Sequence, residues 1–111
     1  MITTHILDTS RGRPASGVAV VLEMQSDEGW RVLGRGATDA DGRVRDLLPA
    51  DFKLAPGTYR LIFQTGDYFD AQHVESFHPQ VTVNFIVRDV GAHYHVPLLL
   101  SPFGYTTYRG S

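Results

Sequence analysis

The stretch Val81-Thr82-Val83-Asn84-Phe85-Ile86-Val87-Arg88 decides the fold class of this 111-residue chain. One set of alternate residues is apolar throughout: Val81, Val83, Phe85 and Val87. Because successive side chains of a strand point to opposite faces, this alternation predicts a β-strand with one face in the core. A helix would instead repeat its apolar residues every three to four positions.

The same alternation occurs elsewhere, and turn residues separate the alternating segments. It occurs in Val18, Val20, Leu22 and Met24, in Tyr59, Leu61 and Phe63, and over a shorter segment at 30–33. The turn signals lie at 11–14, 27–29, 39–42, 55–57 and 101–104. Short strands between such turns predict an antiparallel sandwich or barrel of about seven or eight strands.

Two stretches lack strand alternation. Residues 66–73 are predicted to form one short helix or an irregular turn, and residues 47–54, which include Pro49, a loop. There is no internal repeat or linker, so residues 1–111 are expected to form a single domain.

Composition excludes several classes of partner and chemistry. Ten Lys and Arg against twelve Asp and Glu give a net charge of −2, which provides no electrostatic attraction to nucleic acid or anionic lipid. The absence of cysteine excludes disulfides and thiolate catalysis. No apolar run approaches the roughly 18 residues of a membrane span, and residues 1–5 lack the pattern of a secretory signal. We therefore expect a cytoplasmic protein that binds neither nucleic acid nor membrane.

Apolar residues also occupy the outer faces of the predicted strands. They are Val21, Ile62, Ile86 and Leu99. A strand that is apolar on both faces is usually covered on both, and in a small domain a second subunit can provide the cover. Scattered exposed apolar residues are the alternative explanation. We favour an oligomer.

The five histidines are the main chemical feature of the sequence. They are His5, His73, His78, His93 and His95. If Tyr94, Val96 and Leu98 face the core, His93 and His95 share the opposite face, about 7 Å apart. Three interpretations of this pair are open: two ligands of a zinc site, a general acid or base near neutral pH, or two surface histidines without a function.

Other motifs carry little functional signal. Asp39-Ala40-Asp41-Gly42 resembles the start of a calcium loop, but the later ligands are missing, so a hairpin turn is expected. No Gly-x-Ser-x-Gly motif supports a serine nucleophile. Residues 105–111 are expected to form a polar, aromatic strand that continues to Ser111.

Five segments together resemble a known family. They are Thr4-His5-Ile6-Leu7-Asp8, Arg11-Gly12-Arg13-Pro14-Ala15, Asp39-Ala40-Asp41-Gly42-Arg43, residues 93–102 and Tyr108-Arg109-Gly110-Ser111. The chain resembles the transthyretin-related 5-hydroxyisourate hydrolases over essentially its whole length. Its Tyr-Arg-Gly-Ser ending and two-histidine strand resemble this hydrolase branch rather than the thyroid-hormone carrier transthyretin.

The resemblance implies an all-β, transthyretin-like sandwich of two four-stranded sheets with one short helix, assembled as a homotetramer. It implies active sites in the channel at the dimer–dimer interface. The resemblance implies four catalytic residues: His5, Arg43, His95 and Ser111. It implies that His5, Arg43, Tyr108 and Ser111 bind the substrate. Arg109 is a neighbouring member of the terminal motif. The implied reaction is hydrolytic opening of the six-membered ring of 5-hydroxyisourate, on the route from urate to allantoin, with no metal or cofactor.

The chemistry of these side chains is compatible with the implied roles. We hypothesise that His95 or His5 activates water while the other orients it or relays a proton, because imidazole titrates near neutral pH. Arg43 would stabilise the developing carbonyl charge, and Ser111 would position substrate or water. His93 would orient its strand or line the channel rim, and His73 and His78 would be loop or surface residues.

Two other functions stay open at this point. One is a binding protein for a small aromatic ligand with the same fold and no catalysis. The other is a zinc hydrolase that uses His5, His93 and His95 as metal ligands.

Overall fold

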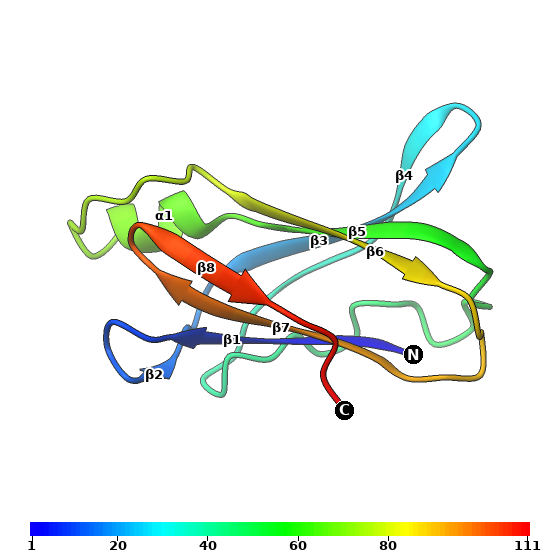
Figure 1. Cartoon of the computed structure of the whole chain (residues 1–111), viewed down its shortest axis with the longest axis horizontal. Helices are drawn as coiled ribbons and strands as arrows, with labels where there is room; N and C mark the ends of the chain where they lie inside the picture. The colour runs from blue at the N-terminus through cyan, green and yellow to red at the C-terminus, as the bar shows by residue number, and fades with distance from the viewer.

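Two four-stranded sheets pack face to face in the computed structural model, which describes residues 1–111 (Figure 1). The sheet orders are β2-β1-β7-β8 and β4-β3-β5-β6. The strands are β1 (Ile2–Asp8), β2 (Arg13–Pro14), β3 (Ala19–Ser26), β4 (Gly29–Ala37), β5 (Gly57–Phe63), β6 (Val81–Val87), β7 (Tyr94–Ser101) and β8 (Gly104–Thr107). The predicted sandwich of two four-stranded sheets with one short helix is confirmed.

The single helix, α1 (Thr65–Asp70), lies within and just before the segment predicted to be helical or irregular. Residues 47–54 contain neither strand nor helix, as predicted. The short strand expected at 30–33 is longer in the structure, because β4 pairs with β3 along its whole length. No helix of the chain is long and apolar enough to cross a membrane.

The core lies between the sheets and is built from the alternating residues. In β6, Val81, Val83 and Val87 are buried, while Thr82 and Ile86 on the other face are exposed. The largest fully buried side chains come from both sheets and α1: Ile6, Leu22, Tyr59, Leu61, Phe63, Phe69, Leu98 and Leu100. Burying a side chain of this size contributes about 1.5–3 kcal/mol, so this layer dominates the stability of the sandwich.

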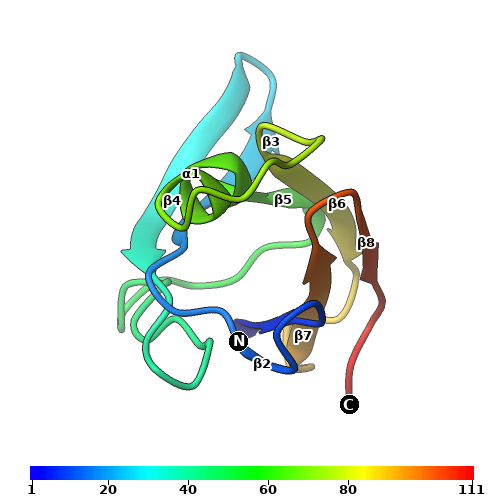
Figure 2. The same ribbon diagram turned by 90° about the vertical axis from the view of Figure 1, so that its left-hand side faces the viewer.

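One strand pair departs from the antiparallel prediction. β1 pairs with β7 in parallel, with Thr3 opposite His95 and His5 opposite Pro97. A short hairpin forces its two strands to be antiparallel, whereas a parallel pair needs a long crossover. Here the crossover is the whole second sheet, because β3 to β6 lie between β1 and β7 in sequence. The end view shows β1 and β7 side by side, opposite the other sheet (Figure 2).

A buried carboxylate links the first turn to the helix. Asp8 is fully buried, and its Oδ1 accepts hydrogen bonds from the backbone N of Ser10 at 3.0 Å and from the Ser10 hydroxyl. The Tyr68 hydroxyl of α1 donates to Asp8 Oδ2 at 2.8 Å. Burial, and then the hydrogen bond to Asp8, raise the pKa of Tyr68. The Asp8 side chain therefore joins β1 to α1, at one end of the sandwich.

Substitution Tyr68→Phe is expected to lower the free energy of unfolding by about 1.5–3 kcal/mol, because it removes one hydrogen bond from a buried charged group. Urea denaturation measures this change. Tyr105→Phe is the matched control, since the Tyr105 hydroxyl makes no hydrogen bond in the chain and the residue is exposed. Equal unfolding midpoints for the two variants would contradict the role given to the Tyr68–Asp8 bond.

Candidate active site

The outer face of the first sheet brings together side chains from β1 and β7. Thr3 and His5 lie on this face of β1, and His95 lies on it in β7. All three are half-buried, while their neighbours in sequence, such as Thr4 and Val96, are buried toward the core. His93 and His95 therefore share the face opposite Tyr94 and Val96, as predicted.

A turn after β4 places Arg43 next to His5. Asp39 Oδ1 accepts hydrogen bonds from the backbone N of Asp41 at 2.9 Å and of Arg43 at 3.1 Å. The bond from the Arg43 backbone is the main cause that lowers the pKa of Asp39. Arg43 then forms a β-bridge with His5. The segment 39–42 is thus a turn, as predicted, in which Asp39 binds backbone amides.

Gly42 allows this turn to lie against β1. Its φ is +78°, a left-handed conformation that glycine adopts readily. Its backbone O accepts a hydrogen bond from Ile6 N at 2.8 Å, and a Cβ on Gly42 would lie 2.4 Å from the Ile6 oxygen. A larger residue at this position would push Arg43 away from His5.

The C-terminal segment continues along β7 but not as an unbroken strand. β8 ends at Thr107, because its next partner in register is Pro97, which has no backbone N–H for the ladder. The Thr107 hydroxyl donates instead to the Pro97 oxygen at 2.8 Å. The ladder resumes at Gly110, whose N donates to the His95 oxygen at 2.8 Å. The prediction of a strand through to Ser111 is therefore only partly correct.

Gly110 also makes room for the His95 ring. A Cβ on Gly110 would lie 2.5 Å from His95 Cδ2 and 3.2 Å from Pro97 Cγ. The imidazole thus packs directly over the backbone of the C-terminal segment. Ser111 is the next residue after this contact. Ser111 is exposed and its side chain makes no hydrogen bond in the chain.

Thr3 is a site residue that the sequence analysis missed. Its Oγ1 lies 2.8 Å from His95 Nδ1 and 2.8 Å from His93 Nε2. The alternation of β1 places Thr3 on the face of His5, which was a signal available in the sequence. Its position opposite His95, however, depends on the parallel register of β1 and β7.

The electrostatic surroundings of His95 favour its neutral form. Burial is the main cause that lowers its pKa below the ordinary 6.5, and the charges of Arg43, His93 and His5 lower it further. Nδ1 contacts Thr3, whereas Nε2 makes no hydrogen bond within the chain. The Arg43 side chain makes neither a hydrogen bond nor an ion pair, so its five N–H donors are available. The face therefore combines a neutral imidazole, a second histidine and an unpaired guanidinium.

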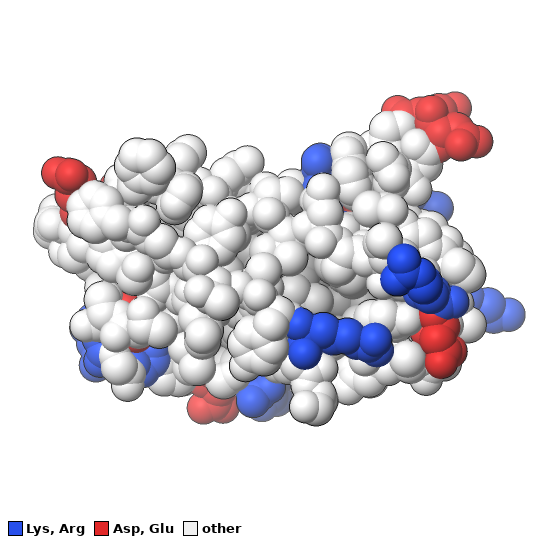
Figure 3. All heavy atoms as spheres, in the orientation of Figure 1, with Lys and Arg blue, Asp and Glu red and all other residues white.

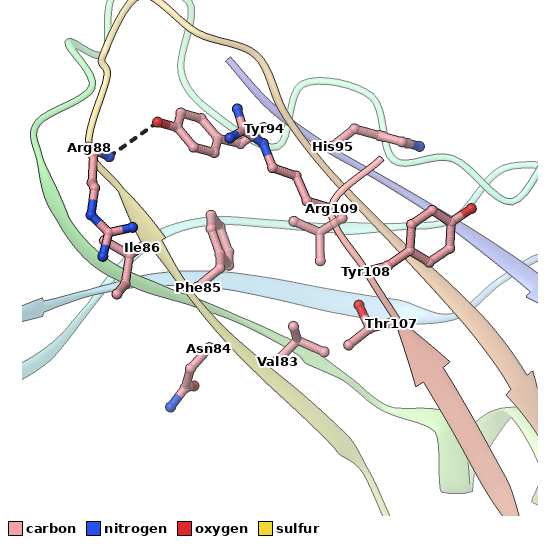
Figure 4. A pocket seen from close by; sticks show the side chains of 11 residues that line it. Val83, Asn84, Phe85, Ile86, Arg88, Tyr94, His95, Thr107, Tyr108 and Arg109 are labelled. Atoms are coloured by element: carbon pink, nitrogen blue, oxygen red, sulfur yellow. Dashed lines mark hydrogen bonds between the residues drawn. The ribbon is translucent and has the colours of Figure 1, made fainter. Parts of the chain in front are cut away.

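Tyr108 and Arg109 lie toward the neighbouring edge of the sandwich. Together with β6 and β7 they line a cavity of about 440 Å³ (Figure 4). His95 is among the lining residues, whereas His5, Arg43 and Ser111 are not. Arg109 stacks over the Tyr94 ring at 4.5 Å, and its Nη2 lies 3.4 Å from the His93 oxygen. This cavity is adjacent to the His5–Arg43–His95 face and separate from most of it.

The remaining histidines lie away from this face. His73 is exposed, after α1, and His78 packs edge-on between Phe77 and Tyr105. In this chain no three His, Cys, Asp or Glu side chains are grouped so that they could hold a metal ion. His5, His93 and His95 are therefore not arranged as the three-ligand set that the zinc alternative requires.

Comparison with known proteins agrees with this architecture. The chain matches the HIUase/Transthyretin family over residues 2–110. It is 50% identical to the 5-hydroxyisourate hydrolase of Salmonella typhimurium over 111 residues, which is 100% of this chain and 81% of that protein. The structure of Klebsiella pneumoniae 5-hydroxyisourate hydrolase is similar, with a TM-score of 0.84 and 36% identity, covering 99% of this chain and 92% of that chain.

A transthyretin structure is also similar, with a higher TM-score and a slightly lower identity. The crystal structure of sea bream transthyretin in complex with thyroxine has a TM-score of 0.91 and 34% identity, and the match covers 98% of this chain and 93% of that chain. The family match spans nearly every residue, and the Salmonella protein is identical at half of the aligned positions. The chain therefore belongs to the HIUase/Transthyretin family.

Proposed function

We propose that this chain hydrolyses 5-hydroxyisourate in urate degradation, with the His5–Arg43–His95 face as its active site. The observation that carries the proposal is the unpaired Arg43 guanidinium, whose charge acts on a neutral His95 while the Arg43 backbone is bridged to His5. The relative from Salmonella typhimurium named as a 5-hydroxyisourate hydrolase supports the choice of substrate.

In the proposed reaction a water molecule attacks a ring carbonyl of the substrate. His95 Nε2 accepts a proton from this water, since a neutral imidazole with one uncommitted nitrogen can act as a general base. Charge develops on the carbonyl oxygen, and the Arg43 guanidinium stabilises it. The ring carbon–nitrogen bond then breaks, and the departing nitrogen takes the proton back from the imidazolium.

His5, Tyr108 and Ser111 would position the substrate and the water. His5 is bridged to Arg43 and acts electrostatically on His95, so it can orient the water or relay a proton. Ser111 follows Gly110, which pairs with His95, and its hydroxyl would bind substrate or water. The exposed ring of Tyr108 would contact the substrate from the side of the adjacent cavity.

The proposal includes assembly of the chain as a homotetramer. β6 and β8 are the outermost strands of their sheets and lie at the same side of the sandwich, so each has an unpaired backbone edge. Exposed edges favour pairing with another chain. Ile86 is 50% exposed, and Figure 3 shows this side of the molecule largely free of charged side chains at its centre. Val21, Ile62 and Leu99 are half-buried on outer faces, which further supports association.

A small-aromatic-ligand binding protein is the second candidate, supported by the similarity to thyroxine-bound sea bream transthyretin. The two candidates differ in the ultraviolet decay of freshly generated 5-hydroxyisourate. A hydrolase accelerates this decay, whereas a binding protein leaves its rate unchanged.

Substitution His95→Ala is expected to slow catalysed decay of 5-hydroxyisourate by about 100-fold or more, because general base catalysis usually contributes that much. The decay is followed by ultraviolet absorbance, and sedimentation velocity checks that parent and variant have the same assembly. His73→Asn is the control, since His73 is exposed and its φ of +57° suits asparagine. Activity within about threefold of the parent would exclude His95 as the base.

The pH profile of kcat/KM is expected to fall on the acidic side below about pH 6.5, because the pKa of His95 is lowered and its neutral form is the active one. Arg43→Gln removes a positive charge that lowers this pKa, so the acidic limb should move to higher pH. Arg43→Lys keeps the charge and should leave the limb in place. A limb at the same pH in both variants would show that another group causes it.

Gly110→Ala is expected to lower activity by about tenfold or more with a small change in stability, because its methyl group would displace the His95 ring or the C-terminal segment. Decay rates and urea midpoints measure the two effects separately. Gly91→Ala is a suitable control, since a Cβ at Gly91 would meet its nearest atom at an ordinary 3.4 Å. Full activity of Gly110→Ala would mean that the close contact does not position His95.

A further inference from the structure

We propose that Thr3 is a positioning residue that holds His95 in the tautomer with its hydrogen on Nδ1, so that Nε2 is the basic nitrogen of the site. The proposal rests on the proposed role of His95 as general base and adds what orients that base. Its basis is geometric: the Thr3 hydroxyl lies 2.8 Å from His95 Nδ1 and 2.8 Å from His93 Nε2, so one oxygen connects the two rings.

The number of available hydrogens restricts how this chain of three groups can be bonded. A hydroxyl has one hydrogen to donate, and a neutral imidazole has one N–H and one acceptor nitrogen. With both rings neutral, the two bonds can form in three ways, because a hydroxyl oxygen can accept two hydrogen bonds as well as donate one. In two of them His95 Nδ1–H donates to Thr3, and Thr3 either donates to His93 Nε2 or accepts from it. In the third, His93 Nε2–H donates to Thr3, which donates to His95 Nδ1.

Only the two arrangements in which His95 Nδ1–H donates to Thr3 are compatible with His95 as a base. In both, Nε2 of His95 has a free lone pair and can accept a proton from water. In the third arrangement Nε2 already carries the hydrogen and cannot accept another. Protonation at Nε2 leaves the bond from Nδ1–H to Thr3 intact, and this bond also stabilises the imidazolium.

The charges around His95 favour the arrangements in which Nδ1–H donates to Thr3. Arg43 from the turn after β4 and His5 from β1 act on His95, as does His93. Two further cations lie nearby: Arg109 at the His93 backbone oxygen and the Met1 ammonium at the Ala92 oxygen. A positive charge near the ring favours a lone pair over an N–H on the nitrogen that is free to face it. His93 is exposed, so its own Nδ1 can bond water whichever tautomer it adopts.

The test compares Thr3→Val, which keeps the shape but removes the hydroxyl, with Thr3→Ser, which keeps the hydroxyl. Nitrogen-15 NMR of the His95 ring at about pH 8, where histidine is neutral, reports which nitrogen carries the hydrogen. We expect the Nδ1–H form in the parent and in Thr3→Ser, and a shift toward the Nε2–H form in Thr3→Val. The Nε2–H form in the parent, or an unchanged ring in Thr3→Val, would overturn the proposal.

Catalysis provides a second measurement. Thr3→Val is expected to lower kcat by about 10- to 100-fold, the effect seen when a hydrogen-bond partner that orients a metal-ligating histidine is lost, with KM little changed. Thr3→Ser should rescue kcat. Thr82→Val, an exposed position on β6 in the other sheet, is the matched control and should leave both kcat and the His95 signals unchanged.

The outcomes separate this proposal from the proposed function. If His95→Ala loses activity but Thr3→Val stays within about threefold of the parent, Thr3 does not position the base, while the proposed hydrolase function stands. If the parent does not hydrolyse 5-hydroxyisourate, the proposed function fails, and the NMR comparison still decides whether Thr3 sets the tautomer.

A second variant covers the case in which Thr3→Val does not fold. Thr3→Ala removes the same hydroxyl and adds no atoms to this face of β1, so His95 Nδ1 again loses its partner. We expect it to raise the Nε2–H form of His95 and to lower kcat. An unchanged His95 tautomer in this variant would also overturn the proposal.

Discussion

The parallel pairing of β1 with β7 is the constraint on which the candidate active site depends. It sets two segments near opposite ends of the sequence side by side, in a register that places Thr3 opposite His95. A shift of one residue would turn every side chain of β1 to the other face. Ile2, Thr4 and Ile6, which are buried, would then leave the core, so the packing of the sandwich enforces the register of the site.

The other parts of the site are attached to this strand pair by backbone bonds. The turn at 39–42 is bonded to Ile6 of β1, and the C-terminal segment is bonded to His95 of β7. Each attachment needs a glycine, Gly42 or Gly110, because a Cβ would overlap the neighbouring strand or ring. The histidines thus lie on rigid strands, whereas the arginine and the terminal residues are brought to them by close backbone contact.

Much of the fold and of the candidate site could be predicted from the sequence, and the reasons differ between the strands and the site residues. Alternation identifies strands such as β6 because burial on one face leaves a period of two in the residues themselves. The family resemblance indicated His5, Arg43, His95 and Ser111, and the structure brings the first three to one face. Thr3 was missed because its contact with His95 arises from pairing across the chain. The end of β8 at Thr107 was missed because it depends on which residue of β7 lies opposite. That residue is Pro97, which has no backbone N–H to donate.

Because Pro97 has no N–H, the end of the chain is attached to the sandwich by fewer hydrogen bonds than the rest of the sheet. Beyond Thr107 a single backbone bond, from Gly110 to His95, joins this segment to β7. Segments with few bonds and little buried apolar surface open at a small fraction of the global unfolding free energy. The last residues therefore form their own local unit, whose amide hydrogens exchange by local opening while the rest of the sheet stays closed. The candidate site is therefore divided between groups fixed by the paired strands and groups at positions 108–111 that depend on one backbone bond.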